Sequence, residues 1–431
     1  MSSQAITKIQ SIILIAVIVV AAVGGVVAYV LLSGEQQSSE TIKIGICADI
    51  DNIIGKCVLQ GAKLAAEQVN AEGGVLGMNF EIVAEDDDSG SGTMDFVVAT
   101  NAMTRLVTVD EADFIISLIY GFTYREIAFE HTKILFTTYE STDELTQGVL
   151  DNYDRYKYYF RAGSGNTTAG MEGIVDSIVA CRNHTSFNKV AFIYWFVMED
   201  FVSSMTDSLE KQGFEVVLSA PITDVPDFSS AFAKVEEAGA EILFPIIFGS
   251  AGIPFVKEYY DRQSPMVMWG NLQMGATNEF WEITEGKCEH ITCGGYSIVA
   301  GYPLTTKTLP TKDAYLERWG EEITSNAAVA YDTVRFILPD AIERAGTTET
   351  EAVIKALEET DIETSLVRRF VFTSSHDIMS VKGPEQKDYF FAATFQWQDG
   401  VLVPVYPIWL MEEAGVSYTF PDWPGPWDNI S

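Results

Sequence analysis

The sequence is poor in basic residues relative to acidic ones. Its 431 residues include 27 Lys and Arg against 61 Asp and Glu, which gives a net charge of −34. A nucleic-acid binder presents a basic surface, so this charge excludes nucleic acid as a partner. Hydrophobic residues make up 47% and aromatic residues 12%, which excludes a disordered acidic chain. The length predicts two or three folded domains.

The sequence also lacks the motifs of common enzymes. It contains no GxSxG, HExxH, Walker or GxGxxG pattern, and its four histidines have no metal-ligand spacing. The triplet Asp86–Asp88 resembles the start of a calcium loop, but the twelfth position holds Val97 instead of the bidentate Glu. We therefore expect no catalytic residues, no metal and no cofactor, and an enzyme is a minor alternative.

The amino terminus carries a long apolar run. No charged residue lies between Lys8 and Glu35, and the segment Ile12 to Leu32 is apolar throughout. A helix over this run would span about 30 Å, the thickness of a bilayer core. The positive flank precedes the run, so the terminus is expected in the cytoplasm and the rest outside. We assign 1–33 to a cytoplasmic stub and membrane anchor and 34–41 to a linker. A cleaved signal peptide is the alternative, although its apolar region usually has about 7–15 residues.

Cysteine is scarce, and export would permit the five cysteines to pair. Cys288 and Cys293 are close enough to bridge a small loop, and Cys47 and Cys57 are expected to bridge a turn. Cys181 would then remain buried as a free thiol. The alternative is that all five are free thiols in the core. A zinc site is not expected because no paired CxxC occurs.

From residue 42 onward, apolar segments with strand character alternate with segments of helical spacing. This alternation predicts parallel sheets covered by helices on both faces. The first series has strands at Ile42–Cys47, Asn79–Ala84, Asp113–Ile119 and Ile134–Thr138, with helices at Lys56–Asn70, Thr93–Val107 and Tyr124–His131. The second series has helices at Asn166–Cys181, Asp200–Gln212 and Asp227–Ala238, and strands at Lys189–Trp195, Glu215–Ser219, Ile242–Phe248 and Met266–Gly270. Later segments predict helices at Lys312–Trp319, Ala327–Ala345 and Glu349–Glu359, and a hairpin of Phe390–Trp397 with Val401–Tyr406.

The predicted strand ends are rich in aromatic residues, glycines and hydroxyls. In open parallel sheets, ligands bind beyond the carboxyl ends of the strands. Small residues expose backbone amides, hydroxyls add hydrogen-bond donors, and aromatic rings exclude water. The sequence therefore predicts a ligand site made of residues from two lobes: Tyr120, Gly121, Phe122, Thr123, Tyr139, Glu140, Ser141, Trp195, Phe196, Ser250 and Asn271.

Five segments stand out in order along the chain: Gly61 to Gly77 (GAKLAAEQVNAEGGVLG), Glu85–Asp88, Asp227–Ser229, Ala330–Asp332 and Phe395–Gly400. Together they resemble type I periplasmic binding proteins of the branched-chain amino acid ABC transporter class, and Gly61 to Gly77 resembles the first helix and turn of that family. The resemblance covers about residues 42–408. It implies a type I periplasmic-binding-protein fold, with two doubly wound parallel-sheet lobes joined by a three-strand hinge.

The resemblance also implies domain limits and roles for particular residues. Lobe 1 would comprise 42–160 plus 295–388, and lobe 2 would comprise 161–294 plus 389–431. In the family, hydroxyls and backbone amides hold the ligand carboxylate, and the matching groups here are Thr123 and Ser141 with their loops. The position that holds the ligand ammonium in the family falls at Leu272. A leucine cannot accept hydrogen bonds from an ammonium, and Glu140, Glu199 or Asp200 could substitute for it.

The sequence thus predicts a membrane-anchored extracytoplasmic protein that captures a small polar ligand, such as an amino acid, and delivers it to ABC permease subunits. One alternative is a ligand-sensing receptor ectodomain that works with a separate signalling subunit. Another is a binder of urea, amides or other carboxylates. A structural role at the cell surface is a further alternative if no ligand exists.

Overall fold

The computed structural model describes residues 41–88, 95–163, 165–223, 228–277, 279–296 and 298–430. The predicted anchor over 12–32 and most of the predicted linker lie outside these residues. Among the described helices, none combines the length and the apolar character that crossing a bilayer requires.

The first sheet is parallel and has the order β2-β1-β3-β4-β5. Its strands are β1 (Thr41–Cys47), β2 (Asn79–Glu85), β3 (Phe114–Ser117), β4 (Ile134–Thr137) and β5 (Tyr159–Arg161). The strands are short and mostly buried, as expected for a parallel sheet covered on both faces. This strand order belongs to doubly wound α/β folds, in which ligands bind where the order reverses.

Helices cover both faces of the first sheet. One core packs α2 and the later helices against the sheet, and another packs α3 and α4 against the opposite face. The helices are α2 (Ile53–Ala71), α3 (Phe96–Thr108), α4 (Gly121–Glu130), α5 (Asp143–Asp151), α6 (Tyr153–Tyr156), α12 (Thr308–Trp319), α13 (Ser325–Asp332), α14 (Leu338–Ala345) and α15 (Thr350–Glu358). The one long helix predicted over 327–345 is interrupted by a π-helical turn, η4 (Thr333–Ile337). We call the first sheet and these helices the first lobe.

The second sheet is also parallel, with the order β10-β8-β6-β7 and β9 paired to β8. Its strands are β6 (Lys189–Trp195), β7 (Glu215–Ile222), β8 (Ile242–Ile247), β9 (Val267–Met268) and β10 (Asn271–Leu272). The helices around it are α7 (Thr167–Thr185), α8 (Glu199–Lys211), α9 (Ser229–Glu237), α10 (Gly252–Arg262) and α11 (Glu279–Ile283), with short 3₁₀ turns η1 (Phe196–Met198), η2 (Gly249–Ala251) and η3 (Gln273–Ala276).

A third sheet lies in the same part of the molecule as the second sheet. It is antiparallel and consists of β11 (Thr292–Gly295), β14 (Ala393–Gln398) and β15 (Val401–Tyr406). The predicted hairpin around Gln398-Asp399-Gly400 is present, with Asp399 and Gly400 at positive φ. The remaining elements are β12 (Asp361–Ile362), β13 (Phe370–Val371), η5 (Pro384–Asp388), α16 (Ile408–Ala414) and η6 (Pro426–Asn429). We call the second and third sheets and their helices the second lobe.

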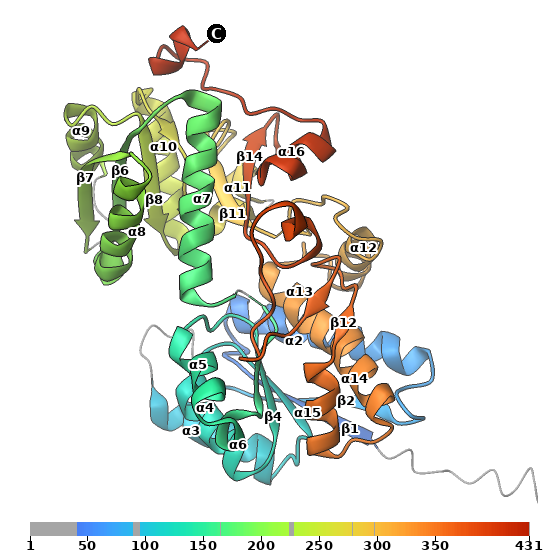
Figure 1. Ribbon diagram of the computed structural model, residues 1–431. Helices are drawn as coiled ribbons and strands as arrows, with labels where there is room; N and C mark the ends of the chain where they lie inside the picture. The colour runs from blue at the N-terminus through green and yellow to red at the C-terminus, as the bar shows by residue number, and fades with distance from the viewer. Residues whose placement is uncertain are drawn as a thin grey trace, which may run out of the picture.

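Figure 1 shows the two lobes one above the other, with α7 running down from the second lobe toward the first. The buried residues change from one core to the other after Ala162, between Cys293 and Ile298, and between Phe390 and Phe391, and Leu304 alone of the later first-lobe segment packs in the second core. Three connections therefore run between the lobes. The domain limits given by the sequence remain a prediction.

The disulfide prediction is wrong, since all five cysteines are buried free thiols. Cys47 packs in one core of the first lobe and Cys57 in the other, so their side chains point apart. The Cys293 thiol donates instead to the Gly275 carbonyl, at 3.1 Å. Burial raises the pKa of Cys288 to about 12, so this thiol stays protonated.

Candidate functional site

The predicted site residues follow the carboxyl ends of neighbouring strands. In the first lobe, β3 and β4 lie side by side, and Tyr120–Thr123 and Tyr139–Ser141 follow them. The two loops touch, because a Cβ added at Gly121 would lie 3.1 Å from Cγ of Glu140. In the second lobe, Trp195 ends β6, Phe196 and Ser250 follow β6 and β8, and Asn271 begins β10 beside the end of β8. The fold thus gathers the predicted residues into one group in each lobe.

Tyr120 differs from the rest of the first group because its side chain is buried. It precedes α4 with a φ of 65°, and its ring lies edge-on to Phe96 at 5.4 Å. The tight turn is followed at once by Gly121, where a Cβ would lie 2.6 Å from Cδ1 of Leu145. Gly121 therefore allows α4 and α5 to approach closely, and Tyr120 supports the loop from within the core.

The other aromatic residues of the two predicted groups are exposed, with the exception of Trp195. Phe122 is 49%, Tyr139 47% and Phe196 54% exposed, whereas Trp195 is half-buried. Thr123 is half-buried, and its hydroxyl has no hydrogen-bond partner among the described residues. The site therefore offers exposed aromatic rings, with the Arg125 guanidinium 5.5 Å from the centre of the Phe122 ring, and an available hydroxyl donor at Thr123.

The loop after β4 is fixed by a buried arginine that the sequence analysis missed. The Arg161 guanidinium donates from Nε to the Glu140 carbonyl at 2.8 Å and from Nη2 to the Thr142 carbonyl at 2.5 Å. It also forms an ion pair with Asp377, 2.5 Å from Nη1 to Oδ1, and Arg161 is fully buried. A charged residue in the apolar segment Tyr159–Ala162 was the signal available in the sequence.

The first residues of α7 bond directly to the same loop. The Thr167 backbone N–H and hydroxyl both donate to the Ser141 carbonyl, at 2.7 and 2.9 Å. The carboxylate of Glu140 accepts from the backbone N–H of Thr142 at 3.2 Å and from its hydroxyl. Ser141 is thus tied through its backbone to the second lobe, and Glu140 is already hydrogen-bonded within its own loop.

In the second lobe, Leu272 is fully buried on β10 and presents no polar group. Glu199 begins α8 and accepts a hydrogen bond from the Tyr194 hydroxyl at 2.7 Å. Asp200 is exposed on the first turn of α8. The Leu272 side chain therefore provides no acceptor for an ammonium group.

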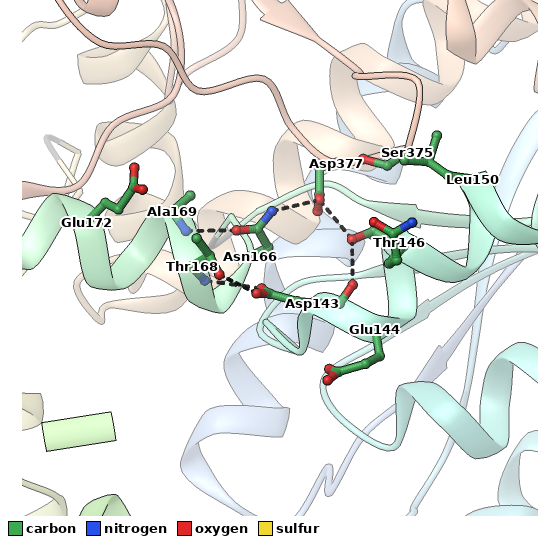
Figure 2. A pocket seen from close by; sticks show the side chains of 11 residues that line it. Asp143, Glu144, Thr146, Leu150, Asn166, Thr168, Ala169, Glu172, Ser375 and Asp377 are labelled. Atoms are coloured by element: carbon green, nitrogen blue, oxygen red, sulfur yellow. Dashed lines mark hydrogen bonds between the residues drawn. The ribbon is translucent and has the colours of Figure 1, made fainter. Parts of the chain in front are cut away.

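A cavity of about 500 Å³ lies between α5, the start of α7 and the segment around Ser375–Asp377. Figure 2 shows Asp143, Asn166 and Asp377 directed toward one another across it. Asp143 accepts from the Thr168 backbone N–H at 3.1 Å, and Asn166 donates to Asp377 at 3.2 Å while capping α7. None of the eleven predicted site residues lines this cavity. Because these polar groups already bond to one another, we assign the cavity to the joint between the lobes and not to ligand binding.

Within the described ranges, no group of three or more His, Cys, Asp or Glu side chains is arranged to hold a metal ion. Asp87, from the acidic triplet, is buried and accepts from the Tyr124 hydroxyl at 2.9 Å.

The sequence profile of the periplasmic binding protein family matches residues 41–383. The chain belongs to this family. A Leu/Ile/Val-binding protein homolog of Brucella suis is 24% identical over 412 residues, which cover 88% of this chain and 94% of the relative. The resemblance to the branched-chain amino acid class is therefore confirmed.

Solved structures show the same fold. One is a Silicibacter pomeroyi protein described as a branched-chain amino acid ABC transporter, with a TM-score of 0.76, 18% identity, and coverage of 89% of this chain and 100% of that one. Another is a branched-chain amino acid transporter substrate-binding protein of Streptococcus pneumoniae in complex with isoleucine, with a TM-score of 0.67, 19% identity, and coverage of 84% and 98%. The prediction of a type I periplasmic-binding-protein fold is confirmed.

Proposed function

We propose that this periplasmic binding protein is an extracytoplasmic solute-binding protein that captures a small polar ligand between its lobes and delivers it to an ABC permease. The observation that carries the proposal is the pair of parallel sheets whose carboxyl ends bear the two groups of site residues. Closure of the lobes about their three connections would bury the ligand, and the closed form would dock on the permease. The apolar segment over 12–32 would hold the protein at the cell membrane.

In this proposal, Thr123 and Ser141 donate hydrogen bonds to the ligand carboxylate, together with the backbone amides of their loops. Phe122 and Tyr139 of the first lobe and Trp195 and Phe196 of the second enclose the ligand. The free hydroxyl of Thr123 supports its role, since an uncommitted donor at a strand end is available to an anion. The Streptococcus structure is a complex with isoleucine, which makes amino acids the first class to test.

The proposal is tested by thermal unfolding of the full chain with a panel of amino acids, amides, urea and small carboxylates. A ligand present at about 100 times its Kd stabilises the folded state by about 2.7 kcal/mol, which raises the unfolding midpoint by several degrees. If no small molecule raises the midpoint, and mass spectrometry of the purified protein finds none bound, solute capture is rejected.

The first prediction concerns Thr123. Thr123→Ala removes a hydrogen bond to a charged ligand group and is expected to weaken binding by about 10- to 100-fold, from about 1.5–3 kcal/mol. Thr123→Ser keeps the hydroxyl and is the matched control, with binding expected within a few-fold of the unmodified protein. Isothermal titration of the ligand identified by the panel measures both. Equal affinities of the alanine and serine variants would remove Thr123 from the site.

A further inference from the structure

An ion pair between the two lobes lies beside their three connections. Lys382 belongs to the first lobe, since Ile378 and Phe390 on either side of it pack in a first-lobe core. The Lys382 Nζ lies 3.1 Å from Oε2 of Glu172 and 3.3 Å from Oδ2 of Asp176, both on α7 of the second lobe. The two carboxylates are four residues apart on one face of the helix, so a single ammonium contacts both.

These three charged residues line a cavity of about 200 Å³ at the joint of the lobes. All three connections contribute to its wall, through Gly165, through Tyr296 and through the segment 390–392. On α7, the wall includes Gly170 and Gly173. A Cβ added at Gly170 would meet no described atom within 4 Å, and one added at Gly173 would lie 3.7 Å from Cβ of Ala392. Here α7 presents bare backbone to the third connection, and the ion pair spans the gap.

The ion pair is also distant from the point where α7 leaves the first lobe. At that point, the Thr167 backbone N–H donates to the Ser141 carbonyl at 2.7 Å. Glu172 and Asp176 follow about 8 and 14 Å further along the helix, at about 1.5 Å per residue. A rotation of the second lobe about the connections displaces residues in proportion to this distance. The contacts of Lys382 with α7 therefore change length when the lobes close.

The lobes stand open in this structure. Phe122 of the first lobe is 49% and Phe196 of the second is 54% exposed, so water reaches the strand ends of both lobes, and a ligand enclosed there would cover these rings. We infer that Lys382 is a positioning residue, whose ion pair with Glu172 and Asp176 stabilises the open arrangement and thereby lowers the affinity for the ligand. This inference rests on the proposed function. The apparent affinity falls with the fraction of molecules in the binding-competent closed state, which the ion pair reduces.

The experiment measures the distance between two fluorescent labels on the full chain without ligand, by single-molecule energy transfer. The labels are attached through Asn101→Cys in α3 of the first lobe and Ser203→Cys in α8 of the second, both at exposed positions. The five native thiols are buried and do not compete for the labels. Both helices begin after strands whose carboxyl ends face the cleft, so closure shortens the distance.

Lys382→Met keeps most of the side-chain length and removes the charge. We expect it to raise the fraction of closed molecules about two- to fivefold, which is the range for an exposed ion pair. Lys257→Met is the matched control, since Lys257 pairs with Glu285 at 2.7 Å within the second lobe. This control should leave the distribution of distances unchanged.

An exchange of charges separates an electrostatic role from a general weakening of the joint. Lys382→Glu places a third carboxylate beside Glu172 and Asp176, and it should populate the closed state more than Lys382→Met does. Addition of Glu172→Lys and Asp176→Lys to Lys382→Glu restores opposite charges. The distribution of distances should then return toward that of the unmodified protein, a recovery that a merely structural role of Lys382 would not produce.

An unchanged distribution in Lys382→Met, or no recovery after the exchange of charges, overturns the inference. For a ligand identified by thermal unfolding, Lys382→Met should tighten binding by the factor by which the closed fraction rises. An equal or weaker affinity in this variant overturns the inference as well. Failure of the whole panel to bind rejects solute capture and leaves the distance measurement standing, so the two failures are distinguishable.

Discussion

Arg161 combines complete burial with a formal charge, and it holds the loop on which two proposed ligand contacts lie. Its guanidinium reaches two carbonyls of that loop and the Asp377 carboxylate, which Thr146 and Asn166 also contact. A buried ion pair is not by itself a gain in stability, but removal of one partner leaves the other charge uncompensated. The main role of the Arg161–Asp377 pair is therefore to fix the position of the loop after β4.

Arg161→Met is expected to lower the free energy of unfolding by about 3–5 kcal/mol, because Asp377 would remain charged and buried. The double variant Arg161→Met with Asp377→Asn removes the stranded charge and should recover part of this loss. Arg318→Met is the matched control, since its pair with Glu67 is half-exposed and should contribute less than about 1 kcal/mol. Urea unfolding measures the free energy of unfolding of all three variants. Similar losses of stability for Arg161→Met and Arg318→Met would contradict the role of burial.

At the scale of elements, α2 and α13 are packed close enough to require a glycine. A Cβ at Gly61 would lie 2.2 Å from the carbonyl oxygen of Ala327, a distance that no relaxed contact allows. The segment from Gly61 to Gly77 also carried the most specific part of the family resemblance. Its first glycine therefore has a packing role in the first lobe.

Gly61→Ala is expected to cost about 1–3 kcal/mol of stability, because α2 or α13 must shift. Gly170→Ala is the matched control in α7, where an added Cβ meets no atom within 4 Å. There alanine removes only backbone freedom and should stabilise by about 0.5–1 kcal/mol. Opposite signs of the two changes in the thermal midpoint support the packing argument, and a loss in both would refute it.

At the scale of the whole molecule, three histidines, distributed over the two lobes, lie in environments that disfavour their charged form. Burial lowers the pKa of His184 and of His290 in the second lobe, and of His376 in the first, below the ordinary value near 6.5. The unfolded chain then binds more protons than the folded one below about pH 6.5. Their contribution to stability is therefore complete above that pH and is lost as the pH falls through it.

Lowering the pH from 7.5 to 6 is accordingly expected to lower the midpoint of thermal unfolding. Asp332 acts in the opposite direction at lower pH, because burial raises its pKa to about 6 and the folded state then holds its proton more tightly. His184→Phe keeps the stacking on Tyr418, whose ring centroid lies 5.5 Å away, and should flatten the pH dependence. Scanning calorimetry at the two pH values measures the effect, and an identical slope in the variant would exclude His184 as a contributor.

The sequence by itself determined the alternating architecture, the two lobes and the strand ends to which the site was assigned. Periodicity encodes these features because apolar spacing follows directly from which face of each element is buried. Even so, the helices α5 and α10 were not predicted, although both are amphipathic, and became clear only in the structure.

Only the tertiary structure decided how individual side chains are used. It kept the five cysteines apart as buried thiols, placed Tyr120 in the core, committed Glu140 and Glu199 to internal hydrogen bonds, and joined Arg161 to Asp377 across 216 positions. Such pairings depend on distances between residues far apart in the chain. Local spacing carries no record of those distances, which arise only when the lobes pack.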